Sequence, residues 1–418
     1  MIKTGLERQK EIYLNGFAGA RSKIPVDWTK LEQRAKSEMS PEAFAYIAGA
    51  AGLESTMSSN RSAFERYKIV PRVLRNVEKR DTSITLLGQR LPYPLLLSPV
   101  GVLQMVRKEA DVAVGKAAAQ IGLPYIFSNQ ASKSMEEVSR EMGDSPRWMQ
   151  LYWSKSNELV ESFAKRAEKC GCSALVITLD TTLLGWRTRD LDIAYLPFLE
   201  GKGIAQYTSD PVFQKLMDEP MDQAKRQITI QSINGLMKMA MNYPGDGFFS
   251  KLFSGRPVKA VQKFIDNYSN PALTWNDLKF LRDKTKLPIL LKGIVHPDDA
   301  RMAIDYGMDG IIVSNHGGRQ VDGAISSLDA LPRIVEVVQN RIPVLMDSGI
   351  RGGADVFKSL ALGAKAVCIG RPYVYGLTID GQRGVEEVMN NLMADFDLTM
   401  GLAGCSTIKD INRDFLTE

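Results

Sequence analysis

The 418-residue sequence predicts an α/β fold of the (β/α)8 TIM-barrel class. Three observations support this prediction: short apolar segments recur eight times, helical patterns lie between most of them, and most segments end in a small or polar residue. Continuous apolar runs are typical of strands buried on both faces. Eight alternations favour a closed barrel over an open sheet, and no early strand is followed by Gly-x-Gly-x-x-Gly.

Bulky aliphatic residues dominate the eight expected strands, and the segments between them repeat apolar residues at helical spacing. Several helical segments begin with Ser, Pro or Asp and end at Gly, the usual start and stop signals. We expect strands at residues 94–99, 124–129, 148–153, 174–180, 288–293, 310–315, 343–349 and 366–372. Residues 1–418 would then form a single barrel domain.

Two segments are additional to the barrel. Residues 1–85 form an N-terminal extension that we expect to be helical from about Trp28 to Arg66. Residues 191–270 separate the fourth and fifth strands, where a connection normally takes about 2–6 residues. A disordered insert would contain fewer aromatic residues. We therefore expect a structured lid over the barrel mouth, with a packing core drawn from Tyr195, Phe198, Tyr207, Phe213, Phe248, Phe249, Met217, Met221, Met237, Met239 and Met241.

Composition excludes several classes of function. The net charge is only +5, and no Lys/Arg-rich run contains interleaved aromatic residues, so we expect no nucleic-acid partner. No apolar stretch reaches the roughly 18 residues of a membrane span, and the chain has neither an N-terminal apolar signal nor a peroxisomal C-terminus. We expect a cytoplasmic protein without a metal site, whose four cysteines are unpaired: Cys170, Cys172, Cys368 and Cys405.

Polar residues follow nearly every expected strand. In a TIM barrel the active site lies at the carboxyl ends of the strands. A barrel does not need a ring of polar residues at this end for stability, and each buried charge there costs free energy unless it is paired. We therefore expect an active site among Ser98, Gly101, Ser128, Gln150, Tyr152, Thr178, Asp180, Lys292, Ser314, Asp347, Gly349 and Gly370.

His316 is one of only two histidines and follows the sixth strand in the segment SNHGGRQ. A lone histidine is more often structural, but this position among glycines, three residues before Arg319, favours a catalytic base. Asp180 ends another strand and would orient the ring and stabilise the imidazolium. His296 stands where a helix begins, and we interpret it as a cap or surface residue.

Arginines occupy four of the loops at the same end of the barrel. Arg187 and Arg319 lie on different loops and could hold a carboxylate between two guanidinium groups, although a solvated loop is an equal alternative for Arg187 alone. Arg189 is expected to hold the loop. Arg351 and Arg371 follow the seventh and eighth strands in glycine-rich segments, where barrels of this class usually bind phosphate.

The motifs together resemble the FMN-dependent α-hydroxy-acid oxidising family, which includes glycolate oxidase, lactate oxidase and lactate 2-monooxygenase. The resemblance covers nearly the whole chain, in the order YIAGAAGLE, RWMQLY, VITLDTTLLGWRTRD, LPILLKGI, VSNHGGRQ, MDSGIRGGADV and IGRP. Within the family the segments GWRTRDLDIAYLPFLEG and YTSDPVFQKLM, the long insertion and Gly101 are most similar to lactate 2-monooxygenase. Gly352 departs from the family pattern, which has a second arginine there.

The resemblance implies a role for each motif residue. His316, Asp180 and Tyr152 would be catalytic, and Tyr46, Tyr152, Arg187 and Arg319 would bind the substrate. FMN would be bound by Ser98, Val100, Gly101, Ser128, Gln150, Thr178, Lys292, Ser314, Asp347, Gly349, Arg351, Gly370 and Arg371. The family also suggests a homo-oligomer, either a tetramer or an octamer.

The expected reaction is oxidation of a small L-2-hydroxy acid, L-lactate in particular, with O2 as acceptor and with decarboxylation to acetate, CO2 and water. One alternative is an oxidase that releases the 2-oxo acid and H2O2. Another is a dehydrogenase that passes electrons to a quinone or a protein. A barrel that only binds a ligand is disfavoured, because His316, Asp180, Arg187 and Arg319 are all present.

Overall fold

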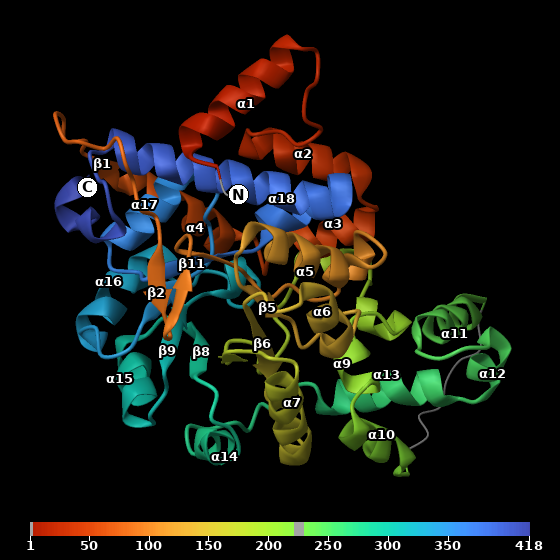
Figure 1. Cartoon of the computed structure of the whole chain (residues 1–418). Coiled ribbons are helices and arrows are strands. Elements are labelled where there is room, and N and C mark those ends of the chain that lie inside the picture. Colours follow the sequence, from red (N-terminus) through yellow and green to blue (C-terminus); the bar gives the residue numbers. More distant parts are fainter. Residues whose placement is uncertain (1–2, 221–229) are drawn as a thin grey trace.

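The computed structural model describes residues 3–220 and 230–418 and contains a closed parallel barrel of eight strands (Figure 1). The order around the barrel is β10-β11-β4-β5-β6-β7-β8-β9. The strands are β4 (Leu95–Leu97), β5 (Tyr125–Phe127), β6 (Arg147–Tyr152), β7 (Leu175–Thr178), β8 (Ile289–Ile294), β9 (Gly310–Val313), β10 (Val344–Met346) and β11 (Ala366–Ile369). Nearly all their residues are buried, as the continuous apolar runs predict. The predicted fold class is confirmed.

Each strand is followed by a helix of the outer layer. These helices are α5 (Ala110–Ile121), α6 (Met135–Met142), α7 (Asn157–Lys169), α14 (Asp277–Lys284), α15 (Pro297–Asp305), α16 (Ser327–Val338), α17 (Gly353–Ala361) and α18 (Arg371–Leu402). The start signals act as expected: Ser134 and Glu137 form a capping box on α6. His296 caps α15, where its Nδ1 accepts a hydrogen bond from the Asp298 amide, so the interpretation as a capping residue is confirmed.

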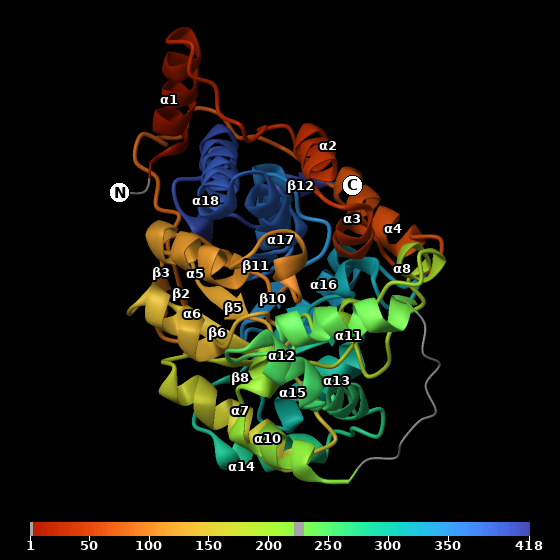
Figure 2. The ribbon, with the colours of Figure 1, turned by 90° about the vertical axis from the view of Figure 1, so that its right-hand side faces the viewer.

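The N-terminal extension is helical over the expected range. It contains α2 (Trp28–Glu38), α3 (Pro41–Ala48) and α4 (Ser55–Arg66), and an earlier helix, α1 (Gly5–Phe17), that the sequence analysis did not anticipate. Helices α1 and α2 contact α18, and Figure 2 shows α1 rising away from the barrel. The chain then forms β1 (Lys68–Ile69), which pairs antiparallel with β12 (Leu416–Thr417).

A hairpin of β2 (Ile84–Leu86) and β3 (Gln89–Leu91) precedes the barrel. Its apolar residues join one buried cluster with side chains inside the barrel, including Leu96 and Trp148. Because the hairpin leads into the start of β4, it closes the amino end of the barrel. The carboxyl ends of the strands, where the predicted site residues lie, form the opposite end.

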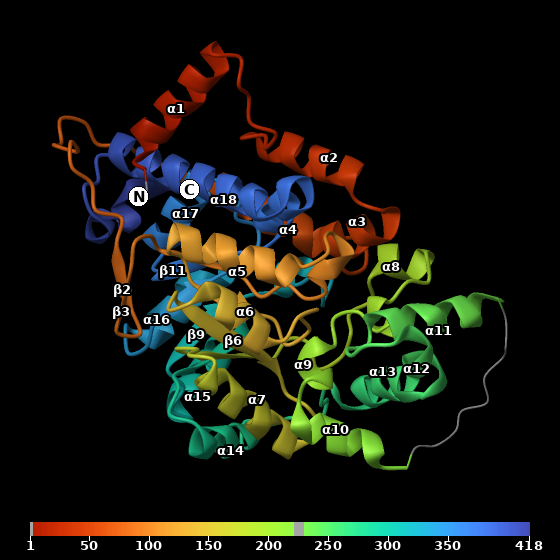
Figure 3. The same cartoon turned by 45° about the vertical axis from the view of Figure 1, so that its right-hand side comes forward.

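The insertion between β7 and β8 is helical and forms a lobe beside the barrel (Figure 3). Its elements are α8 (Thr188–Asp192), η2 (Pro197–Glu200), α9 (Ala205–Thr208), α10 (Pro211–Asp218), α11 (Ile230–Asn242), α12 (Phe248–Phe253) and α13 (Arg256–Asn267). The expected packing core includes the buried Phe198, Tyr207, Phe213 and Met217. The interpretation is wrong for Phe249, Met241 and Met237, which are exposed because α12 and the outer face of α11 turn outward. Met221 lies outside the described residues.

All four cysteines are free thiols, as the sequence predicts. Among the helices of residues 3–220 and 230–418, none is both long enough and apolar enough to cross a membrane.

Candidate active site

A cavity of about 1050 Å³, which includes space open to solvent, lies at the carboxyl ends of the strands. Most of the predicted site residues line it: Tyr46, Ser98, Val100, Gly101, Tyr152, Arg187, Lys292, His316, Arg319, Asp347, Gly349, Arg351, Gly370 and Arg371. Five others do not line it and lie on β6 or β7 or just beyond the ends of β5, β7 and β9: Ser128, Gln150, Thr178, Asp180 and Ser314. The insertion reaches the cavity through Phe198, and Tyr268 follows α13 into the same wall.

His316 is held in a defined orientation directly after β9. Its Nδ1 lies 2.8 Å from Asp180 Oδ1 and 3.2 Å from Thr181 Oγ1, and Thr181 also donates to that carboxylate. Its φ of 59° is in the left-handed region, which costs free energy for a residue with a side chain and indicates that its surroundings constrain it. With Nδ1 bound to the carboxylate, Nε2 is the ring nitrogen that can accept a proton.

The charges around His316 favour a neutral ring beside an ionised carboxylate. Burial lowers the pKa of His316, and the attraction of Asp180 opposes this effect only in part. Burial alone would raise the pKa of Asp180, but His316 and Lys292 outweigh it, and the pKa falls below its ordinary value. A neutral imidazole paired with a carboxylate is the state that a general base requires.

Arg187 and Arg319 both face the ring of Tyr46. Their guanidinium carbons lie 6.0 and 4.9 Å from the ring centroid. Among the described residues, both guanidinium groups donate hydrogen bonds only to neutral oxygens. Arg319 donates to Gly49 O, for example, and Arg187 donates to Gln320 Oε1. Burial, with repulsion from Arg187, lowers the pKa of Arg319 to about 9. Two desolvated cations at one place make a strong site for a carboxylate.

Lys292 supplies a third fixed cation. Its Nζ lies 2.7 Å from Ser314 Oγ and 3.0 Å from Asp347 Oδ2. Burial would lower its pKa, but Asp347 and Asp180 outweigh that effect and raise it. Gly293, the next residue, has a φ of 104°, and a β-carbon there would stand 2.7 Å from the β-carbon of Asp180. Glycine therefore lets β8 approach the carboxylate that holds His316.

Arg351 and Arg371 also line the cavity. Arg371 donates to three carbonyl oxygens at 2.9–3.1 Å, and the Arg351 guanidinium lies 3.9 Å from the ring centroid of Trp28. Burial lowers the pKa of both, that of Arg351 to about 9, and the charge of Arg371 contributes to the shift of Arg351. An anion is the natural partner for this pair. A β-carbon on Gly352 would meet one atom within 4 Å among the described residues, Asp395 Oδ2 at 3.1 Å, which is the end of a side chain.

The residues present fit FMN. Ser98 Oγ, Gln150 Nε2, Thr178 Oγ1 and Arg351 Nε are buried and have no hydrogen-bond partner within the described part of the chain. Buried polar atoms almost always have a partner, so these four indicate a polar ligand. Ser98 follows β4, and Gln150 and Thr178 lie on the adjacent strands β6 and β7, so a flat ring could lie across this end of the barrel. Arg351 and Arg371 would hold the phosphate.

Motif reading missed several residues of the site. Thr181 binds both members of the His316–Asp180 pair, and Gln320 joins Arg187 to the backbone of Asp180. Both are next to predicted residues in the sequence, so an argument from loop position could have found them. Arg189 pairs with Glu54, as its expected role in holding the loop suggests.

Comparison with known proteins defines the class of enzyme. A family model described as FMN-dependent dehydrogenase matches residues 35–418, and the chain belongs to this family. It is 42% identical to an L-lactate oxidase of Lysinibacillus sphaericus, over 94% of this chain and 92% of the relative. It is 41% identical to an FMN-dependent α-hydroxy acid dehydrogenase of Penicillium citrinum, over 97% and 94%.

A solved structure of mandelate oxidase with (S)-4-hydroxymandelic acid superposes with a TM-score of 0.77 at 33% identity, covering 94% of this chain and 98% of that one. The protein is therefore an FMN-dependent oxidoreductase that oxidises 2-hydroxy acids. The family and the cofactor expected from the sequence motifs are confirmed.

Proposed function

We propose that the protein oxidises L-lactate with O2 and releases acetate, CO2 and water. The observation that carries this proposal is the arrangement of His316, bound to Asp180, and the guanidinium groups of Arg187 and Arg319 around one cavity. A base and a carboxylate clamp at one place are what a small 2-hydroxy acid requires.

Each side chain has a defined task in this proposal. Arg187 and Arg319 hold the substrate carboxylate, and His316 accepts a proton at Nε2 while Asp180 stabilises the imidazolium. Burial and the charge of Asp180 raise the pKa of Tyr152, so its hydroxyl stays protonated and can donate a hydrogen bond to the substrate. FMN supplies the two-electron acceptor and the subsequent reaction with O2.

The products depend on how long the 2-oxo acid stays in the cavity. If pyruvate is retained until peroxide forms, its carboxylate leaves as CO2 and the balance is lactate + O2 → acetate + CO2 + H2O. If pyruvate leaves first, the products are pyruvate and H2O2. The walls that the insertion contributes, Phe198 and Tyr268, support retention. The relatives named L-lactate oxidase, from Lysinibacillus sphaericus and a Nostoc strain, keep the oxidase outcome as the alternative.

Product analysis tests the proposal. The holoenzyme is incubated with L-lactate, O2 and excess catalase, because free H2O2 would itself convert pyruvate into acetate. Acetate near one equivalent per O2 consumed supports decarboxylation in the cavity, whereas pyruvate contradicts it and identifies an oxidase. Glycolate and (S)-mandelate are compared at equal concentration, and a higher kcat/KM for either would contradict the choice of lactate. His316→Ala is the control for background chemistry.

We also propose a homo-oligomer, a tetramer or an octamer. Exposed apolar side chains on α1 support self-association: Leu6, Tyr13, Leu14 and Phe17 are 57–95% exposed. Light scattering coupled to size exclusion tests this, and a monomer at micromolar concentration would contradict it.

The cytoplasmic location stays a prediction, and a relative from Arabidopsis thaliana is named as peroxisomal. Imaging of a fluorescent fusion in the source cell tests it.

A further inference from the structure

Tyr207, on α9 of the insertion, is fully buried within a cluster of aromatic rings. Phe163 of α7, Phe213 of α10 and Phe264 of α13 meet its ring edge-on, at centroid distances of 5.1, 5.5 and 4.8 Å. Its hydroxyl donates to Asn129 Oδ1 at 2.8 Å. A phenol in an apolar cluster requires such a partner, because an unpaired hydroxyl there costs free energy.

Asn129 connects Tyr207 with β6. Its Oδ1 also accepts the backbone N–H of Tyr152 at 3.3 Å, and its own backbone N–H donates to Gln150 Oε1 at 3.1 Å. Because the amide of Tyr152 can only donate, the oxygen of the Asn129 carboxamide must face it. Asn129 thus fixes the backbone that carries Tyr152. It also orients the Gln150 amide, whose Nε2 has no partner among the residues that the structure describes.

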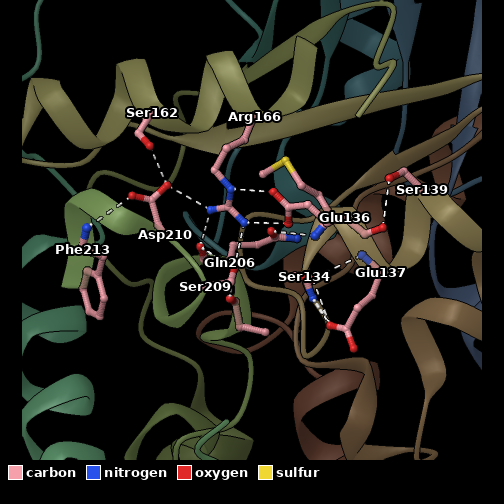
Figure 4. A network of polar contacts seen from close by, with 12 residues as sticks. Ser134, Glu136, Glu137, Ser139, Ser162, Arg166, Gln206, Ser209, Asp210 and Phe213 are labelled. Carbon is pink, nitrogen blue, oxygen red and sulfur yellow. Dashed lines mark hydrogen bonds and ion pairs between the residues drawn. The ribbon is translucent and has the colours of Figure 1, made fainter. Parts of the chain in front are cut away.

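The position of Tyr207 is set by the outer helices of the barrel. Figure 4 shows Arg166 of α7 at the centre of a polar network that includes Gln206 and Ser209, which flank Tyr207 in the sequence. Its guanidinium donates to Gln206 O at 2.7 Å, to Ser209 Oγ at 2.7 Å, to Asp210 Oδ2 at 3.0 Å and to both carboxylate oxygens of Glu136. The residues on both sides of Tyr207 are therefore fastened to α6 and α7.

We infer that Tyr207 is a positioning residue of the active site, which acts through Asn129 on Tyr152 and Gln150. Tyr207 does not line the cavity, and its only polar side-chain atom donates to Asn129, so we assign it no contact with substrate or FMN. Through Tyr207, the first part of the insertion holds the end of β6 in place. The inference rests on the oxidation of 2-hydroxy acids with FMN, and it does not depend on lactate as substrate or on the fate of the 2-oxo acid.

The variant Tyr207→Phe tests the inference, because it removes only the hydroxyl and keeps the aromatic cluster. Tyr306→Phe is the matched control: Tyr306 also donates to an asparagine oxygen, Asn276 Oδ1 at 3.0 Å, but on the exposed outer face. Two quantities are measured: the rate of anaerobic flavin reduction at saturating 2-hydroxy acid, and the Kd for FMN binding to the apoprotein.

We expect Tyr207→Phe to slow reduction about tenfold, because small displacements at a reacting centre have large effects on rate. We also expect its Kd for FMN to rise several-fold, since Gln150 loses its fixed orientation. Tyr306→Phe should leave both quantities within about twofold of wild type, as surface substitutions usually do. Equal behaviour of the two variants in both measurements would overturn the inference, even if Tyr207→Phe lowers the melting temperature.

A double-mutant cycle identifies the route of the effect. If Tyr207 acts through Asn129, adding Tyr207→Phe to Asn129→Ala should change neither quantity further. Effects that multiply would contradict the route. If Asn129→Ala does not fold, the comparison of Tyr207→Phe with Tyr306→Phe decides alone. Failure of the wild-type flavin to be reduced by any 2-hydroxy acid would instead contradict the assigned reaction.

Discussion

A β-carbon on Gly101 would stand 3.1 Å from the β-carbon of Gln130 and 3.3 Å from its carbonyl oxygen. That carbonyl accepts the backbone N–H of Val102 at 2.8 Å, so the loops after β4 and β5 are held together here. The φ of Gly101 lies outside the left-handed region. Glycine is therefore required for the close approach of Gln130, which lines the cavity, and not for a turn.

Gly101→Ala should change the oxygen half-reaction more than flavin reduction. The added methyl group displaces Gln130 in a packed wall, whereas the contacts of His316 and the arginines are unaffected. We expect slower reoxidation or a shift from acetate toward pyruvate and H2O2. Stopped-flow measurements of each half-reaction, together with the melting temperature, test this. A lower melting temperature with equal losses in both steps would show that the glycine is only structural.

The pH dependence of kcat/KM should reflect the lowered pKa of His316. A base must be neutral to accept a proton, so activity should persist as the pH falls through about 6.5 and should be lost only at lower pH. Asp180→Asn removes an attraction that raises the pKa of His316, so the acid limb should shift to still lower pH while the maximal rate falls. An acid limb above pH 6.5 in the wild type would contradict His316 as the base.

Arg319→Lys should lower kcat/KM about 10- to 100-fold, because an ammonium cannot make the paired hydrogen bonds of a guanidinium to a carboxylate. Arg189→Lys is the control. Arg189 is on the same loop as Arg187 but pairs with Glu54, and a lysine can maintain that ion pair. Steady-state kinetics on both variants test the role of Arg319, and similar values of kcat/KM for the two would contradict it.

Removal of the outer half of the insertion should increase H2O2 release per turnover. Replacing residues 220–254 by a short Gly/Ser linker keeps α10 and α13, whose facing ends are joined by the Asp218–Arg256 ion pair at 3.5 Å. It removes α11, whose Lys238 and Asn242 hold Glu200 beside the cavity wall. The control replaces only residues 246–253 and so removes α12. An unchanged ratio of acetate to H2O2 in the longer deletion would show that α11 does not help to retain the 2-oxo acid.

Binding of FMN should raise the melting temperature of the apoprotein, since it neutralises the repulsion between Arg351 and Arg371. At 100 times its Kd a ligand stabilises the folded state by about 2.7 kcal/mol. Riboflavin, which lacks the phosphate, is the matched control and should stabilise less at the same concentration. Equal shifts for both ligands in a thermal melt would contradict the phosphate role of the two arginines.

The barrel could be predicted because the signals that determine each strand and helix lie within short segments of the sequence. The strand expected at 288–293 forms at Ile289–Ile294, since a continuous apolar run is sufficient to bury both faces. The strand expected at 343–349 ends at Met346, because Ser348 and Gly349 have positive φ and turn the chain away. Helix α1 was missed although Thr4 and Glu7 form a capping box, a signal that the sequence does contain.

The supports of the site could not be predicted in the same way. Tyr207 and Asn129 are 78 positions apart, and nothing in the spacing of either segment relates them. Their contact depends on how the insertion packs on α7, which is a tertiary property. Motif residues such as His316 could be predicted as site residues because their type, position and neighbours all indicate chemistry. A tyrosine in an aromatic segment indicates only burial.

The β2–β3 hairpin has a consequence for the evolution of this enzyme. It contributes Ile84, Leu86 and Leu91 to the interior at the amino end of the barrel, and none of these three residues lines the cavity at the carboxyl end. Substitutions there can alter thermal tolerance without changing substrate range, while loops at the other end can diversify without loosening the interior. Adaptation to temperature and adaptation to a new substrate can thus proceed at opposite ends of one barrel.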